Sequence, residues 1–313
     1  TTANNNTGIG YQALKANTTG TNNVAVGNVA LASATTASDN TACGNGALNA
    51  TTTGASNAAL GKSALLLNTT GAQNTALGKD ALRANTTASA NTAVGYDALT
   101  ANTTGQHNIA IGSFSLDACT TGQENTAIGY DALTAVTTGE ENVAVGKDAG
   151  SSITTGNDNV CSGKSAGHNI TTGSNNIVIG NGATNISSTG SNVITLGNSN
   201  HDNLRCNDTS ISSLSDKRDK TEIIDLPIGL DFINNLLPRK FKWQTRDGNI
   251  KDGLYRAGFI AQELQEAQKD SDYLDLVLDK NPERLEAKQE HLIPVLVKAI
   301  QELSAEVKAL KAA

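Results

Sequence analysis

The first 200 residues repeat one pattern of polar, small and apolar positions with a period of 17 residues. The unit reads approximately N-T-A-(I/V/L)-G-x-x-A-L-x-x-x-T-T-G-x-x. A fixed period is typical of repeat proteins, and this one is too short for the common helical repeats. Eleven copies stay in register: Asn stands at 6, 23, 40, 57, 74, 91, 108, 125, 142, 159 and 176, and Gly four residues after each.

The residue types within each unit predict β-structure. Asn125–Gly129 has the composition of a short strand that ends at Gly, and Thr137–Gly139 that of a turn in which Gly takes a positive φ. Stacked coils would place the Asn side chains above one another, so that their amides form a hydrogen-bonded ladder. We therefore predict an all-β repeat shaft, a parallel β-roll or β-helix of 17-residue coils.

The two faces of the predicted strand differ in composition. The fourth position of the unit is almost always Ile, Val or Leu, so we expect that face to be buried. The third position, on the opposite face, is nearly always Ala and never Lys, Glu or Gln, so we expect it to pack against other copies of the chain. One coil also has few large side chains with which to fill its own interior. These points predict a homotrimer of interwound or side-by-side coils, about 50 Å long at about 4.8 Å per coil.

A column of paired Thr residues, from Thr18-Thr19 to Thr171-Thr172, has two interpretations. A flat Thr array orders water in ice-binding solenoids, whereas Thr hydroxyls in a turn bond to backbone groups. Adjacent side chains point in opposite directions and do not form one flat array, which favours the turn. Aromatic residues of the repeats are expected on the surface, where single exposed rings usually have no role; they are Tyr11, Tyr96, Phe114 and Tyr130.

The remainder of the chain is charged and non-repetitive, and its pattern predicts an α+β domain. Helices are expected at Leu226–Leu237 and Gly258–Gln268, with a strand at Phe241–Trp243 and a turn at Asp247–Asn249. The last helix carries an a/d heptad seam, which is typical of a parallel coiled coil and here predicts three strands. The seam consists of Ile293, Leu296, Ile300, Leu303, Val307 and Leu310.

Composition and charge argue against several functions. Residues 1–200 carry 6 Lys/Arg and 10 Asp/Glu, which leaves 23 − 6 = 17 and 30 − 10 = 20 for residues 201–313. The net charges are −4 and −3, so neither part offers a basic face for nucleic acid. No apolar run approaches the roughly 20 residues of a membrane span. The chain has no Met, so we expect it to be a fragment of a longer protein.

The cysteines fit no metal or disulfide spacing, and we expect no cofactor and no metal. They are predicted to be small buried residues in a reducing compartment; they are Cys43, Cys119, Cys161 and Cys206.

Between the two parts, Ser215 precedes Lys220 by five residues in the stretch Leu214–Lys220. A Ser with a nearby Lys can form a nucleophile–base dyad if burial lowers the pKa of the Lys. The alternative is a solvated charged loop, or a Ser or Asp that caps the turn after it. Spacing alone does not decide between them, because short motifs often match by accident.

Two resemblances extend this interpretation. The Asn-x-Ala-Ile-Gly units resemble the head repeats of trimeric autotransporter adhesins and similar repeats of phage tail fibres. Residues 213–313 resemble the intramolecular chaperone domain of phage tailspikes and endosialidases, the peptidase S74 family. That resemblance is carried by Ser215-Asp216-x-Arg218-x-Lys220, Pro238–Trp243, Gly258–Leu264 and Leu292–Leu303.

The second resemblance implies that the domain assembles the β-structured part as a trimer and then cuts itself off. It assigns Ser215 as nucleophile, Lys220 as base and Leu214–Ser215 as the bond cut; Asp216 and Arg218 match the motif without an assigned role. Any enzymatic activity is then autoproteolysis alone, with no external substrate expected.

We therefore predict a β-roll shaft at 1–200, a connector at 201–214 and a chaperone domain at 215–313, ending in a coiled-coil helix. The predicted role is a virion tail fibre or tailspike, assembled as a homotrimer in the host cytoplasm and binding a host-cell receptor or glycan. The alternative is a trimeric adhesin head on a bacterial surface with a trimerisation domain that does not cut. Its expected membrane β-strands are missing from the C-terminal sequence, which ends in a charged heptad helix.

Overall fold

The computed structural model describes residues 2–201, 215–244, 250–279 and 285–312. The chain divides into two compact units, Thr1–Leu204 and Arg205–Ala313. We call the first the shaft and the second the carboxy-terminal unit.

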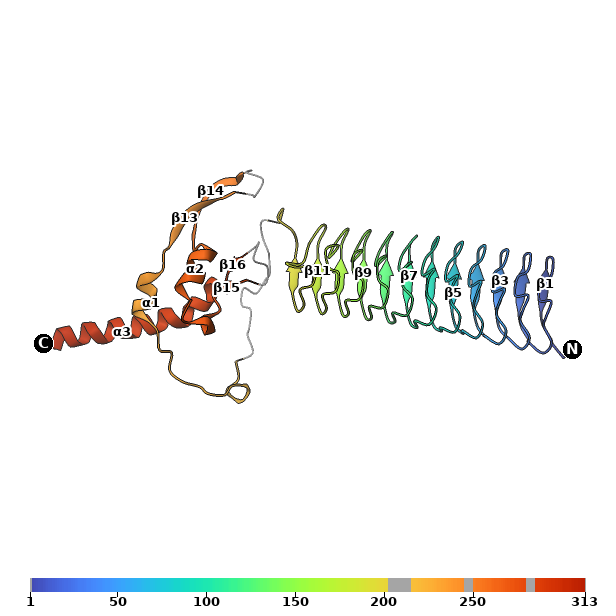
Figure 1. Cartoon of the computed structure of the whole chain (residues 1–313), viewed down its shortest axis with the longest axis horizontal. Coiled ribbons are helices and arrows are strands. Elements are labelled where there is room, and N and C mark those ends of the chain that lie inside the picture. Colours follow the sequence, from blue (N-terminus) through green and yellow to red (C-terminus); the bar gives the residue numbers. More distant parts are fainter. Residues whose placement is uncertain (1, 202–214, 245–249, 280–284, 313) are drawn as a thin grey trace. The chain divides into compact units, whose positions relative to one another are not determined.

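The shaft is a parallel β-solenoid in which each coil contributes one three-residue strand to a single twelve-stranded sheet (Figure 1). Strands that are consecutive in the chain are neighbours in the sheet, and the register offsets them by one repeat, as where Ala110 pairs with Ala127. The predicted β shaft is confirmed. Each coil therefore pairs its strand with the neighbouring coils of its own chain. The strands are β1 Thr7–Ile9, β2 Val24–Val26, β3 Thr41–Cys43, β4 Ala58–Leu60, β5 Thr75–Leu77, β6 Thr92–Val94, β7 Ile109–Ile111, β8 Thr126–Ile128, β9 Val143–Val145, β10 Val160–Ser162, β11 Ile177–Ile179 and β12 Ile194–Leu196.

The strands bury the face opposite to the one expected from their sequence. Ala110 in β7 has no exposed surface, whereas Ile109 and Ile111 on either side of it are 40% and 39% exposed. The expectation that the large fourth-position residues point inward and the Ala residues outward was therefore wrong. Most coils fill their own narrow interior with third-position Ala and with a fully buried Leu such as Leu116, so only a methyl group is needed beneath the strand.

The predicted Asn ladder is present and lies inside the solenoid. The Oδ1 of Asn108 accepts hydrogen bonds from the backbone N–H of Asn125 at 3.0 Å and from its amide at 3.3 Å. The amide of Asn108 donates to the carbonyl of Gly122 at 2.9 Å. Each Asn thus joins its own coil to the next and satisfies polar groups that burial would otherwise leave unpaired.

The Thr column follows the turn interpretation. The Oγ1 of Thr103 donates to the carbonyl of Thr120 in the following coil at 3.0 Å, and the same bond repeats along the shaft. These hydroxyls therefore cap backbone groups.

Glycine after each strand allows the coils to approach closely. Gly95 has a φ of +142°, and a Cβ on it would lie 2.5 Å from the carbonyl oxygen of Gly112 in the next coil. In two coils, glycine stands at the interior position that is usually Leu, and a large side chain elsewhere in the coil fills the space. In one of them the position is Gly150 and the space is filled by Ile153, since a Cβ on Gly150 would lie 3.1 Å from the Ile153 Cδ1.

Two of the four cysteines are interior residues, as predicted. Cys119 and Cys161 are buried, and burial raises the pKa of their thiols to about 11 and about 12. Cys43 is half-buried and lies at the outward fourth position of β3. Cys206 lies outside the described residues.

The carboxy-terminal unit combines helices with two small antiparallel sheets. Helix α2 contacts both strands of the β15–β16 sheet, and the core of the unit includes Leu264, Leu276 and Val295. The predicted turn at 247–249 lies outside the described residues, and no described helix is long and apolar enough to span a membrane. The elements are the 3-10 helix η1 Lys217–Asp219, α1 Leu230–Asn235, β13 Arg239–Gln244, β14 Ile250–Gly258, α2 Ala261–Ala267, η2 Asp272–Leu274, β15 Val277–Leu278, β16 Glu286–Ala287, η3 Gln289–Leu292 and α3 Ile293–Ala312.

Candidate functional site

A short turn brings together the two residues predicted as nucleophile and base. Between them the backbone forms η1, which ends where the N–H of Lys220 bonds to the carbonyl of Lys217. The Nζ of Lys220 donates a hydrogen bond of 2.5 Å to the Oγ of Ser215. The local fold therefore places the amine of Lys220 against the hydroxyl of Ser215 within a segment of six residues, which is the contact that the predicted dyad requires.

The other two motif residues form the turn itself. The Asp216 carboxylate caps η1 by accepting from the backbone N–H of Arg218 at 2.9 Å. It also pairs with the Arg218 guanidinium, with its shortest contact at 2.6 Å. These hydrogen bonds lower the pKa of the Asp216 carboxyl below its usual range, so the pair stays ionised. Asp216 and Arg218 thus hold the turn in which Ser215 meets Lys220.

Both members of the dyad are exposed in the single chain. A Lys acts as a base only from its neutral amine, and removal from water is the usual way to favour that form. In the single chain, Ser215 and Lys220 are therefore close enough to form a hydrogen bond, and both remain exposed to solvent. Leu214, the residue on the other side of the predicted bond, lies outside the described residues.

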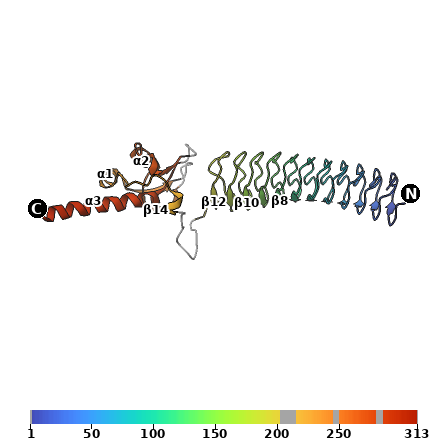
Figure 2. The same ribbon diagram turned by 90° about the horizontal axis from the view of Figure 1, so that it is seen from below.

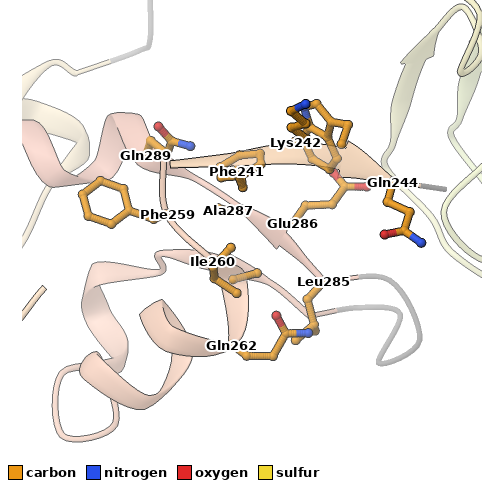
Figure 3. Close-up of a pocket in the computed structure, with 12 residues that line it drawn as sticks. Phe241, Lys242, Gln244, Phe259, Ile260, Gln262, Leu285, Glu286, Ala287 and Gln289 are labelled. Atoms are coloured by element: carbon orange, nitrogen blue, oxygen red, sulfur yellow. The ribbon is translucent and has the colours of Figure 1, made fainter. Parts of the chain in front are cut away.

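A groove of about 570 Å³ lies beside β13 in the same unit (Figure 3). Its lining includes Phe241, Phe259 and Ile260, with Gln289 at one end. Beside it, Arg239 of β13 forms a two-point ion pair with Glu263 of α2, with nitrogen–oxygen distances of 2.6 and 2.9 Å. This pair joins the β13–β14 hairpin to α2.

Comparison with known families covers the segment that contains the dyad. Residues 215–273 match the family model described as chaperone of endosialidase. These residues form a chaperone-of-endosialidase domain. The match begins at Ser215 and ends before α3, so it covers part of the resemblance described from the sequence. Neither a curated protein nor a solved structure matches the chain. A β-solenoid followed by this chaperone domain fits a tail fibre with a C-terminal chaperone.

The helix that follows the chaperone domain presents its heptad seam to solvent. A neighbouring side of the helix packs on the unit through Val295 and Ala299, which are buried. All six seam residues are exposed, from Val307 at 40% to Leu310 at 78%. The seam is thus free to pair with the same helix of other chains, as the coiled-coil prediction requires.

Three aromatic rings on the shaft contact one another, whereas the sequence analysis expected single, separate rings. Tyr96, Phe114 and Tyr130 lie in successive coils and pack edge to face, with ring centroids 5.3 and 6.0 Å apart. Lys79 and Lys147 lie over the two outer rings. The 17-residue period, which places the sixth and seventh positions of successive coils side by side, was the signal for this cluster. Each ring pair stabilises the stack by about 0.5–1.5 kcal/mol.

Proposed function

We propose that this chain is part of a bacteriophage tail fibre or tailspike. In this proposal, residues 1–200 form a homotrimeric shaft, 201–214 a connector and 215–313 a chaperone that assembles the trimer and then releases itself. The location would be the virion tail, after assembly in the host cytoplasm, and the partner a host-cell receptor or glycan. The hydrogen bond between Lys220 and Ser215, at the first residue of the matched domain, is the observation that carries the release step.

The cleavage chemistry follows from the position of Ser215 next to the bond. Neutral Lys220 takes the hydroxyl proton, and Oγ attacks the carbonyl carbon of Leu214. The carbon–nitrogen bond breaks, the Ser215 nitrogen receives a proton, and Leu214 is left as an ester on Oγ. Water then hydrolyses this ester, which yields a carboxylate on Leu214 and restores the hydroxyl. Trimer formation supports the step if it covers the exposed dyad and favours the neutral amine.

The register of the shaft explains the need for a chaperone. Its coils are nearly identical, so a slip by one repeat between chains loses only contacts at the ends. A trimer that forms first at one end fixes the stagger and raises the effective concentration of the remaining coils. Removing the chaperone afterwards leaves a shaft that unfolds slowly and does not readily reassemble.

Intact mass measurement of three variants beside the wild type tests the release. We expect wild type to yield fragments of 214 and 313 − 214 = 99 residues, and Ser215→Ala and Lys220→Ala to remain whole. Lys217→Ala is the matched control, because it removes an exposed Lys from the same turn and should still cut. Cleavage of Ser215→Ala at the same bond, or a trimeric wild type that never cuts, would contradict the mechanism.

A truncation tests the assembly role separately. Residues 1–214 expressed without the rest should remain monomeric or aggregate, whereas Ser215→Ala should form a stable uncut trimer. A soluble trimer from residues 1–214 alone would show that the shaft needs no chaperone.

A further inference from the structure

One face of the shaft is an uncharged strip. The second and fourth positions of β1 to β12 point outward, and all twelve strands lie on one side of the solenoid (Figure 2). Exposed apolar side chains dominate this strip, including Ile109, Ile111, Val143, Val145, Ile177 and Ile179. We call these outward positions the sheet face.

Composition separates the sheet face from the other sides of the coil. Not one of its positions in β1 to β12 is Lys, Arg, Asp or Glu; they are apolar residues, Thr, Cys and Ser. The shaft's charged residues stand in the turns, for example at the sixth and seventh positions, where Lys147 and Asp148 lie. A water-facing sheet normally carries charges that prevent contact with other sheets, and a long apolar strip without them marks an interaction surface.

We infer that the sheet face packs against the sheet faces of two further copies of this chain around a common axis. The inference rests on the proposed homotrimer and assigns its shaft interface, which the sequence had placed on the Ala residues. Copies of the same chain are the fitting occupant because both sides then repeat at the same spacing of about 4.8 Å. The exposed seam of α3 provides a second self-complementary apolar surface in the same chain.

The sheet face is smaller than a typical stable interface between proteins. Twelve coils and three residues per strand give a face of about 50 Å by 10 Å, on the order of 500 Å² per chain. A stable interface buries about 800 Å² per partner, so the sheet face alone falls short of initiating assembly. The chaperone and its helix seam can supply the missing contact, which links this surface to the proposed role of the carboxy-terminal unit.

Cys43 is a natural probe, since its side chain belongs to the sheet face. With Cys206→Ser in place, Cys43 is the reactive thiol of the shaft, because Cys119 and Cys161 are buried. The matched control carries Cys43→Ser and Ala55→Cys, a half-buried position of the same coil outside the strand. In the uncut trimer, we expect maleimide to alkylate Cys43 at least about tenfold more slowly than the control thiol.

The outcomes separate this inference from the proposed trimer. Equal alkylation rates in a proven trimer would overturn the sheet-face interface while the trimer stands. A monomeric parent protein would instead contradict the trimer itself. The monomeric seam variant Ile300→Glu with Leu303→Glu should alkylate both thiols at similar rates, and slow Cys43 alkylation there would also overturn the inference.

A second pair of variants does not depend on thiol chemistry. Ile111→Glu with Ile128→Glu adds two charges to the sheet face, and Gln106→Glu with Gln123→Glu adds two to exposed positions outside the strands of neighbouring coils. Both changes should be near neutral in a single chain because all four side chains are exposed. In the trimer we expect the first pair to lower the melting temperature of the shaft by about 5 °C or more relative to the second. Equal melting temperatures in a trimeric shaft would exclude the sheet face as the interface.

Discussion

The carboxylate of Glu302 accepts a hydrogen bond of 2.7 Å from the backbone N–H of Leu230, 72 residues earlier in the chain. Glu302 lies in α3 and Leu230 begins α1, so this bond joins the heptad helix to the chaperone domain. A negative charge at a helix N-terminus satisfies an unpaired backbone donor there. Glu302 also lies 3.7 Å from Lys298, one helical turn before it.

Replacing Glu302 should loosen this connection. We expect Glu302→Ala to lower the free energy of unfolding of the carboxy-terminal unit by about 1 kcal/mol, the usual loss for a helix cap. Trp243 is the only Trp in the chain and lies in β13, so its fluorescence during urea unfolding reports on this unit. Glu302→Gln retains an acceptor oxygen and should lose less; an equal loss in both variants would argue against the cap.

The seam of α3 should determine oligomeric state. Ile300→Glu with Leu303→Glu places charges within the predicted coiled coil, and we expect light scattering to show loss of the trimer. Gln301→Glu with Ser304→Glu adds the same charge at exposed positions outside the seam. Loss of the trimer in both pairs would point to charge in general rather than to the seam.

Replacing a single Asn of the ladder should lower the stability of the shaft. In Asn108→Ala, the backbone N–H of Asn125 loses its partner inside the solenoid, and the carbonyl of Gly122 keeps only the weak bond from the Cys119 thiol. An unpaired buried group costs about 1–3 kcal/mol, so we expect a loss of at least about 1–3 kcal/mol in shaft stability. Thermal unfolding followed by far-UV circular dichroism measures it, with exposed Gln106→Ala as the control. A loss no larger than that of the control would mean that water replaces the missing amide.

The glycines after the strands should not tolerate a side chain. Gly112 has a φ of +132°, and an added Cβ would lie 2.4 Å from the carbonyl oxygen of Gly129. We expect Gly112→Ala to destabilise the shaft by about 2–4 kcal/mol in the same thermal measurement. Gly8→Ala is the contrasting change, because its Cβ would make only an ordinary contact of 3.5 Å with Leu14. Similar stabilities of the two variants would show that the coils can move apart.

Acid should weaken the attachment of the hairpin to α2. The hydrogen bonds from Arg239 lower the pKa of the Glu263 carboxyl below its ordinary value. A lowered pKa in the folded state adds stability above the unfolded value of about 4.3, and this stability is lost as pH falls through the folded pKa. We expect urea unfolding followed by Trp243 fluorescence to show a smaller loss of stability with acid in Glu263→Gln. An identical acid dependence in both proteins would assign the effect to other groups.

Periodic and local features of this protein are visible in its sequence. The 17-residue period specifies stacked coils, strands before each Gly, and the ladder of Asn125 and its equivalents, because identical units can satisfy their backbone only by pairing with one another. The contact between Ser215 and Lys220 was expected from the family resemblance and not from their spacing alone; a single turn over six residues forms it.

Which side of each strand is buried was decided by the tertiary structure. Alternation shows that Ala110 and Ile111 face opposite ways, but it does not say which one faces the interior. That depends on the width of the closed coil, where Leu116 and the Asn ladder leave room for only a methyl group. The cap between Glu302 and Leu230 likewise joins residues far apart in sequence, and only the packing of α1 on α3 brings them together.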